Sequence, residues 1–335
     1  MATTTLLVLA VIFLTLVYDM TNGWNDAANS IATVVSTKVL RPYQAVAMGA
    51  TLDFIGALVS SEVARTVGKD IAAPHTLTVV TFLAAVIIAP IWITLCTYQG
   101  LPISCSHSLL GGLVGAVLAT SGVKGLKIEG IKKIAFGVFI SPILGFILGF
   151  IVVAIIYWFF KRLSLAKVNK IFGKLQLVSA AAMAFSHGTG DAQKGMGIIT
   201  GTLLTAGWIS LDAEGQMHIP LWVRILCALT IAMGTAVGGW RVVKTLGSKL
   251  AHLKPYQGFA AETAASITIL MNTLSGVPLS TTHSITGAVM GVGSSQGIRI
   301  VKWGIGGKIV FAWFVTFPVC IGGGYLIYKL LDIIF

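Results

Sequence analysis

The sequence is short of charge, and above all of negative charge. Charged residues make up only 10% of its 335 residues, with 11 acidic side chains against 23 lysines and arginines, while 56% of the residues are hydrophobic. Soluble domains usually carry about 25% charged residues, so this composition excludes an ordinary soluble protein. Because the mean hydropathy is +0.91, we predict a multi-pass protein of the cell (cytoplasmic) membrane, with the lipid bilayer as its surroundings.

Cysteine is also scarce, and its placement excludes two kinds of site. The four cysteines lie in apolar or small-residue segments without CxxC spacing, which argues against a metal centre and against a disulfide framework. The net charge of +12 would suit nucleic acid, but the basic residues lie mostly in short loops between apolar runs. Membrane orientation explains that placement better, so no nucleic-acid partner is expected.

The apolar segments fall into two sets separated by a basic stretch. The first set lies within residues 1–160 and the second within residues 175–335, while residues 161–174 carry five basic side chains and no acid. By the positive-inside rule, this stretch is a cytoplasmic linker between two transmembrane repeats.

Short motifs recur in the same order in both halves, which indicates a duplication. Residues 102–108 read Pro-Ile-Ser-Cys-Ser-His-Ser, and residues 278–284 read Pro-Leu-Ser-Thr-Thr-His-Ser. Likewise, the Asn-Asp-Ala of residues 25–27 aligns with the Gly-Asp-Ala of residues 190–192.

Loop charge suggests that the two repeats are inverted. The loop after the first long segment holds Lys38 and Arg41 in one half, whereas its counterpart holds Asp212 and Glu214. Opposite charge at equivalent loops implies opposite sidedness, as in transporters built from inverted repeats.

Inversion needs an odd number of crossings in each half, and re-entrant hairpins supply it. Residues 77–120 and 258–294 are each expected to enter and leave on one face, with tight tips at the Gly-x-Pro sequences before the two hydroxyl motifs. Non-helical backbone at such tips is tolerated where it lines a cavity. The predicted fold class is an all-α polytopic membrane protein with two inverted-topology repeats, each with broken helices and a re-entrant helical hairpin.

The duplicated hydroxyl motifs are candidate anion sites. In each, a proline lies just before a candidate N-cap serine, which is a helix-start signal. A helix N-terminus with free backbone N–H groups beside several hydroxyls is suited to an oxyanion. The candidate ligands are Ser104, Ser106, Ser108, Ser280, Thr281, Thr282 and Ser284, with His107 and His283 as either ligands or scaffold. Helix capping would explain a single copy, but the duplication favours the anion site.

Acidic residues inside the apolar segments are few. Inserting one of them at the middle of the bilayer costs about 3 kcal/mol of free energy. Asp26 and Asp191 are repeat partners beside glycine-rich sequence that is expected to break a helix and free backbone carbonyls. Such oxygens bind hard cations. The candidate sodium ligands are Asn22, Asn25, Asp26, Asn29, Asp191 and Gln193, and the candidates for coupling or gating are Asp19, Asp53, Glu262 and Lys194.

The motifs resemble the inorganic phosphate transporter (PiT) family over nearly the whole chain. The resemblance rests on residues 22–29, on residues 186–194 and on the paired Leu/Val-Pro-x-Ser-x-x-His blocks. It implies a secondary active transporter that imports inorganic phosphate by sodium symport with alternating access. It also implies phosphate between the two hairpin tips, sodium at the two Asp motifs and no resident cofactor. Gly190 departs from the family pattern, which has Asn there, so the second cation site would lean on backbone or water.

Three alternatives stay open at this point. A proton-coupled phosphate (or metal-phosphate) symporter would use Asp53 or Glu262 as the titrating group, and a sulfate permease of the same fold would carry a different oxyanion. A passive anion channel would gain nothing from buried carboxylates. A hydrolase is not expected, because the serines are clustered and no GxSxG sequence surrounds them. The sequence is also compatible with a homodimer.

Overall fold

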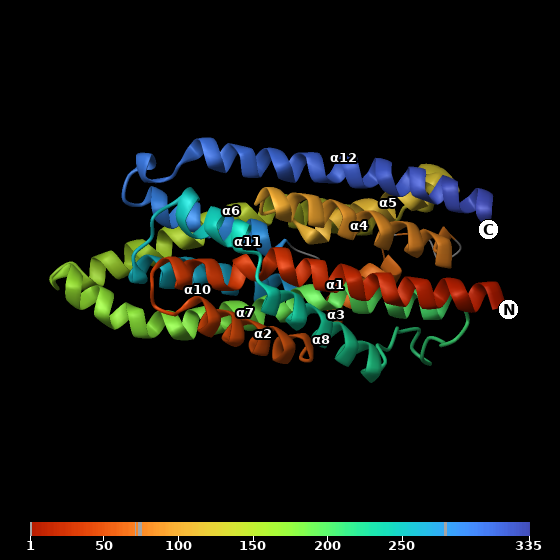
Figure 1. Ribbon diagram of the computed structural model, residues 1–335, viewed down its shortest axis with the longest axis horizontal. Coiled ribbons are helices and arrows are strands. Elements are labelled where there is room, and N and C mark those ends of the chain that lie inside the picture. Colours follow the sequence, from red (N-terminus) through yellow and green to blue (C-terminus); the bar gives the residue numbers. More distant parts are fainter. Residues whose placement is uncertain (1, 71, 73–75, 278–279) are drawn as a thin grey trace.

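The computed structural model describes residues 2–70, 72, 76–277 and 280–335, and within them the chain is built of helices that run along one long axis (Figure 1). The longest are α1 (Ala2–Ser36), α6 (Ile128–Phe160), α7 (Leu165–Thr205) and α12 (Trp303–Ile334). Among the described residues, five helices are long and apolar enough to cross a membrane, or up to seven if each bent pair is one span. The prediction of an all-helical, multi-pass membrane protein is confirmed.

Shorter helices fill the space between the long ones. In the first half they are α2 (Pro42–Ala57), α3 (Glu62–Arg65), the π-helical turn η1 (Thr66–Asp70), α4 (Val79–Gln99), α5 (Cys105–Ser121) and η3 (Gly122–Gly125). In the second half they are α8 (Leu221–Val237), α9 (Trp240–Lys244), the π-helical turn η4 (Thr245–Leu250), α10 (Pro255–Leu274), α11 (Thr281–Ser294) and η5 (Ile298–Ile300). The buried apolar side chains form two main clusters, one around α4 and α5 and the other around α10 and α11.

Each half contains a broken helix, but the breaks are not at the Asp motifs, so that expectation was wrong. The breaks bend the chain by 66° between α2 and α3 and by 60° between α8 and α9. By contrast, α1 and α7 are continuous through both aspartates. The glycines beside the aspartates serve close packing instead. A Cβ on Gly23 would meet the backbone of Ile231 in α8, and one on Gly188 would meet the backbone of Asp53 in α2.

A helical hairpin is present at each predicted position, one in each half, while the re-entrant course of both hairpins stays a prediction. The first consists of α4 and α5 joined at Gly100 (φ 70°), and the second consists of α10 and α11 with Gly276 (φ 66°) after α10. Positive φ is cheap for glycine, which explains its place at both turns. Pro278 and Leu279 of the second tip lie outside the described residues. In Figure 1, α4 and α5 lie on the side of the two chain ends, while α10 and α11 lie towards the opposite side. The inverted relation of the two repeats stays a prediction.

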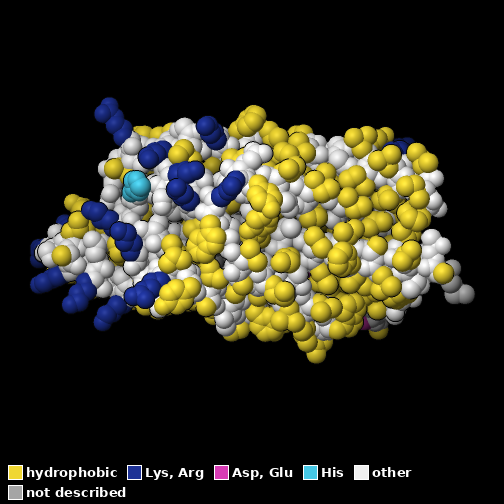
Figure 2. Space-filling model, viewed as in Figure 1, with side chains coloured by type: hydrophobic (Ala, Val, Ile, Leu, Met, Phe, Trp, Pro, Cys, Tyr) yellow, Lys and Arg dark blue, Asp and Glu magenta, His cyan; other side chains and the backbone are white. Residues whose placement is uncertain are grey.

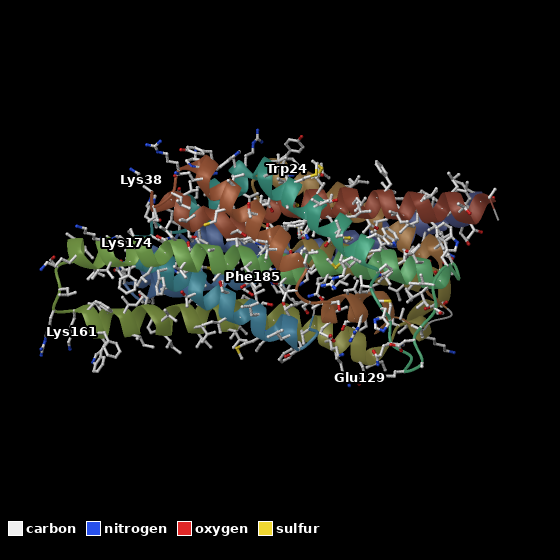
Figure 3. The ribbon with its side chains drawn as sticks, turned by 90° about the horizontal axis from the view of Figure 1, so that it is seen from below. Trp24, Lys38, Glu129, Lys161, Lys174 and Phe185 are labelled. Atoms are coloured by element: carbon white, nitrogen blue, oxygen red, sulfur yellow. The ribbon has the colours of Figure 1, made fainter. Side chains whose placement is uncertain are left out.

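Basic side chains gather at the end of the molecule opposite the chain termini (Figure 2). Figure 3 shows Lys38, Lys161 and Lys174 at this end and Glu129 at the other. Most of the predicted linker is helical, because α7 already begins at Leu165. We call the end of the molecule at which these lysines lie the basic end.

Candidate functional site

The two predicted repeat partners, Asp26 of α1 and Asp191 of α7, lie together in the interior. Both are buried, and Thr281 Oγ1 lies 3.5 Å from Asp26 Oδ2 and 3.3 Å from Asp191 Oδ2. The amide of Asn22, oriented to donate, also bridges the same two oxygens at 3.2 and 3.3 Å. Trp24 of α1 and Phe185 of α7, which precede the two aspartates in sequence, lie near the middle of the molecule in Figure 3.

The tip of the second hairpin contacts this pair through two threonines. Thr282 Oγ1 donates to Asp26 Oδ1 at 2.8 Å. Asn29 Nδ2 donates to Thr281 Oγ1 and Thr282 Oγ1 at 3.3 and 3.0 Å. The start of α11 is therefore fastened to α1 by hydrogen bonds that include a carboxylate, and such bonds are stronger than neutral ones.

The first hairpin is held by the same helix. Asn25 Nδ2 donates to Thr97 Oγ1 at 2.7 Å, near the end of α4. Since Asn25 and Asn29 are one helical turn apart, α1 holds one hairpin with each. The amide oxygens of both asparagines are buried and have no hydrogen-bond donor among the described residues. Each unmatched buried acceptor costs about 1–3 kcal/mol, and an oxygen-seeking cation would satisfy both.

A histidine joins the carboxylate pair to a third acid. His187 Nδ1 lies 2.9 Å from Asp53 Oδ1, and Thr235 Oγ1 donates to Asp53 Oδ2 at 2.5 Å. On its other side, His187 Nε2 lies 3.5 Å from Asp191 Oδ2 and 4.0 Å from Asp26 Oδ2. The ligand atoms of Asp26, His187 and Asp191 all lie within 4.8 Å of one another, which is close enough to share one cation.

Lys194 brings a buried positive charge into the site. Its Nζ donates to Asp191 Oδ1 at 2.6 Å, and both side chains are 1% exposed. Lys194 is one of the predicted coupling or gating residues, and its ion pair with Asp191 was not predicted. The i,i+3 spacing of an acid and a base on one helix was the available signal.

Gln193, a predicted sodium ligand, has its amide engaged elsewhere. Its Oε1 accepts the backbone N–H groups of Val63 and Ala64 at 2.7 and 3.2 Å, and its Nε2 donates to the carbonyl of Thr189 at 2.6 Å. The side chain therefore caps the start of α3 rather than turning a free oxygen towards the carboxylates.

The N-cap predictions for the hydroxyl motifs are confirmed. Ser104 Oγ accepts the N–H of His107, and Ser280 Oγ accepts the N–H of His283, both at 3.2 Å. The serine four positions after each cap donates back to the carbonyl of the cap, at 3.2 Å in the first motif and 3.1 Å in the second. The remaining hydroxyl of the first motif, on Ser106, is buried.

The two motif histidines connect the hairpin tips to each other and to α12. The imidazole centroids of His107 and His283 are 4.6 Å apart, with the planes at 80°. His283 stacks on Trp313 at 3.7 Å, and His107 lies 4.7 Å from the ring of Phe317. Their observed ring contacts are thus with each other and with an apolar helix.

The remaining two acids differ in how well they are hydrogen bonded. Glu262 accepts bonds from Thr33 (2.5 Å), Gln176 (3.0 Å) and Ser179, so it joins α1, α7 and α10. Asp19 is buried, yet neither of its oxygens has a nitrogen or oxygen donor among the described residues. Of the predicted coupling residues, Asp53 and Lys194 therefore lie at the carboxylate pair and Glu262 lies in a separate network.

The Asp19 carboxylate packs where the neighbouring helix has a glycine. It faces Gly195 on α7, where a Cβ would touch both carboxylate oxygens. The neighbouring donor is the thiol of Cys227, a weak one. Asp19 lies seven residues before Asp26 on α1, on the same face of the helix.

Paired hairpins whose tips meet buried carboxylates, on a bundle of membrane-length helices, define a membrane transporter rather than an enzyme. Residues 22–324 match the phosphate transporter family, and the chain belongs to that family.

Relatives of similar length support this assignment. The chain is 39% identical over 332 residues to the "probable low-affinity inorganic phosphate transporter" of Bacillus subtilis, covering 98% of each chain. It is 44% identical over 313 residues to the protein of the same description from Rhizobium meliloti, covering 93% of this chain and 92% of that one. A solved structure described as "the sodium-dependent phosphate transporter" has the same fold, with a TM-score of 0.89 at 24% identity, covering 98% of this chain and 100% of that chain.

Proposed function

We propose that this protein imports inorganic phosphate by sodium symport, using alternating access across the cell membrane. The observation that carries the proposal is the Asp26–Asp191 pair, which is bonded to the hydroxyl-rich start of α11 and flanked by unmatched amide oxygens. The solved structure of the same fold is itself described as sodium-dependent, which supports the choice of cation.

Phosphate would bind between the starts of α5 and α11. Both begin at a capped serine, so their first backbone N–H groups point towards the tips of the hairpins. A helix N-terminus contributes only about half a positive charge. The serine and threonine hydroxyls would complete the coordination, and His107 and His283 would hold the two tips in register.

Sodium would bind to the oxygens around the carboxylate pair. The side chains of Asn22, Asn25, Asn29, Asp26 and Asp191 offer carboxylate and amide oxygens, the ligand type that hard cations take. His187 offers nitrogen, so we assign it a positioning role in which Asp53 fixes its ring.

The charge balance of the core makes the two ions depend on each other. Among the described residues, the buried acids are Asp19, Asp26, Asp53, Asp191 and Glu262, and the buried amine is that of Lys194. If all are ionised and the histidines are neutral, five carboxylates and one ammonium leave four negative charges. A divalent phosphate cannot join such a site unless cations bind as well, which makes its affinity dependent on sodium.

Proton coupling is the second candidate mechanism. The observation that favours it is that the buried carboxylate of Asp19 has no nitrogen or oxygen donor among the described residues. Asp53 and Glu262, the earlier candidates for titration, accept hydrogen bonds from neighbouring side chains. Asp19 has no comparable donor. Because a protonated carboxyl needs no partner charge, Asp19 would carry the proton.

Labelled phosphate uptake into proteoliposomes tests these alternatives. Sodium and proton gradients are imposed separately, with excess sulfate as competitor. Uptake driven by sodium alone and resistant to sulfate is expected. Uptake that follows only the proton gradient would move coupling to Asp19, and loss of uptake in sulfate would identify a sulfate carrier.

A further inference from the structure

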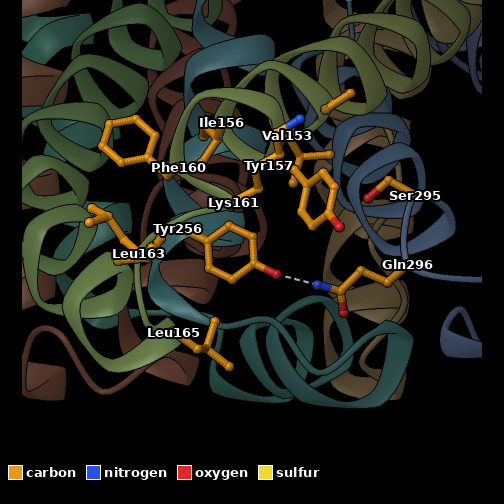
Figure 4. Close-up of a pocket in the computed structure, with 12 residues that line it drawn as sticks. Val153, Ile156, Tyr157, Phe160, Lys161, Leu163, Leu165, Tyr256, Ser295 and Gln296 are labelled. Carbon is orange, nitrogen blue, oxygen red and sulfur yellow. Dashed lines mark hydrogen bonds between the residues drawn. The ribbon is translucent and has the colours of Figure 1, made fainter.

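A cavity of about 600 Å³ opens at the basic end of the molecule (Figure 4). It lies where α6 ends, α7 begins, α10 begins and α11 ends, so it is separate from the carboxylate site. Its volume is in the usual range for a bound small molecule, about 300–1,000 Å³.

The lining of this cavity has an apolar part and a polar part. Val153 and Ile156 of α6 and Val168 of α7 are buried and line the apolar part. Lys161 and Gln296 line the polar part. An occupant that uses both parts must be amphipathic, because an inorganic anion would leave the apolar part against water and a hydrocarbon would leave the lysine unused.

The residues around the cavity are of the types found at the boundary between membrane and water. Tyr157, Trp158 and Phe159, at the end of α6, are 71%, 63% and 68% exposed. Aromatic side chains of this kind are enriched at membrane interfaces. The next residues, 161–174, carry five basic side chains and no acid, and the basic side chains gather over this end (Figure 2).

We infer that this cavity binds an anionic phospholipid. The lipid phosphate would lie at Lys161, and one acyl chain would follow the apolar part formed by α6 and α7. Basic pockets between transmembrane helices are the sites at which anionic headgroups are recognised. A zwitterionic lipid of the same chain length would have no net charge to match the surrounding lysines and would bind less tightly.

The lipid would contact the second hairpin, α10 and α11, whose tip reaches the carboxylate pair. Tyr256 is the second residue of α10, and Gln296 follows the end of α11; Gln296 Nε2 donates to the hydroxyl of Tyr256 across the open end of this hairpin (Figure 4). Both line the cavity. A lipid seated there would limit how far the two arms separate, and this consequence for transport rests on the proposed function.

Native mass spectrometry of the detergent-purified protein tests the binding site. Phosphatidylglycerol and phosphatidylcholine with identical acyl chains compete for the wild type, for Lys161→Gln and for Ala154→Trp, which fills the cavity from an exposed lining residue. The matched control is Lys133→Gln, an exposed lysine near the other end of α6.

The wild type is expected to retain phosphatidylglycerol preferentially. Lys161→Gln should lower that preference about fivefold, which corresponds to about 1 kcal/mol for one lysine near an anionic surface, and Ala154→Trp should remove one bound lipid. Lys133→Gln should match the wild type. Equal retention of both lipids, or a Lys161→Gln protein that behaves as the wild type, would overturn the assignment, as would displacement of the lipid by inorganic phosphate alone.

Phosphate uptake into vesicles with and without phosphatidylglycerol tests whether lipid binding in the cavity affects transport, separately from whether the lipid binds. Faster uptake with the anionic lipid in the wild type, but not in Ala154→Trp, is expected. No uptake in any vesicle, with lipid binding intact, would refute the proposed function and leave the lipid site standing.

Discussion

The five buried carboxylates differ most in the donors that reach them, and this difference suggests their roles. Glu262 has three donors, and Asp53 has one hydroxyl and one imidazole partner. Asp191 has an ammonium and Asp26 has threonine hydroxyls, while Asp19 has no nitrogen or oxygen donor among the described residues. Well-hydrogen-bonded acids hold helices together, whereas the less satisfied ones are suited to taking up an ion or a proton.

Removing the ammonium of Lys194 should destabilise the protein through the charge left behind. A buried pair broken at one partner typically costs about 3–5 kcal/mol, because the other charge is then uncompensated. Lys194→Gln should therefore lower the midpoint of thermal unfolding in detergent, and adding Asp191→Asn should recover most of that loss. A double variant no more stable than Lys194→Gln would show that the ion pair is not the cause.

Removing one hydroxyl from the second hairpin should weaken ion binding without disturbing the fold. Thr282→Val keeps the shape but loses the bond to Asp26 and the acceptor for Asn29. A hydrogen bond to a charged group contributes about 1.5–3 kcal/mol, so phosphate affinity in saturating sodium should fall about tenfold or more, measured by isothermal titration.

Thr268→Val is the matched control, because among the described residues the hydroxyl of this buried threonine bonds only within α10, to the carbonyl of Ala264 at 2.8 Å. It should bind phosphate as the wild type does. Equal losses in the two variants would mean that any buried threonine matters and that the contact with Asp26 does not.

At the level of the elements, the helix starts and hairpins could be predicted, but the position of the helix breaks could not. The cap at Ser104 and the turn at Gly100 follow from local chemistry that the sequence displays. Whether a glycine breaks a helix or lets another helix approach depends on the neighbour, which the sequence does not show. The same limit hid the contact of Gln193 with α3.

Close packing at Gly188 should be essential to the fold. A Cβ there would lie 2.6 Å from Asp53 Cα, with the backbone of α2 unable to yield easily. Gly188→Ala should thus lower the unfolding midpoint or prevent folding, and it should disturb the neighbouring contact of His187 with Asp53. Gly322→Ala, on α12 where a Cβ has open space, should be neutral or slightly stabilising. Similar midpoints for both variants would contradict this account of the glycines.

For the whole molecule, the sequence predicted the class and the family, and the structure supplied the distances. Composition and loop charge indicated a polytopic membrane protein, and the described helices confirm it. The Gly-x-Pro tips predicted two helical hairpins, which are present. The duplicated motifs predicted Asp26 and Asp191 as cation ligands, but not that the two carboxylates lie together. The cavity at the basic end could not be predicted, because its walls come from two pairs of consecutive helices, α6–α7 and α10–α11, that lie far apart in the sequence.

If sodium and phosphate bind interdependently through Asp26, phosphate affinity should depend on sodium only while that carboxylate is present. Phosphate affinity of the purified protein is measured by isothermal titration over a series of sodium concentrations. The wild type and Asp26→Asn are compared with Asp332→Asn, which changes an exposed acid at the end of α12. Affinity in the wild type and in Asp332→Asn should rise about tenfold or more with sodium, a coupling of about 1–3 kcal/mol, and should stay flat in Asp26→Asn. Wild-type sodium dependence in Asp26→Asn would contradict the account.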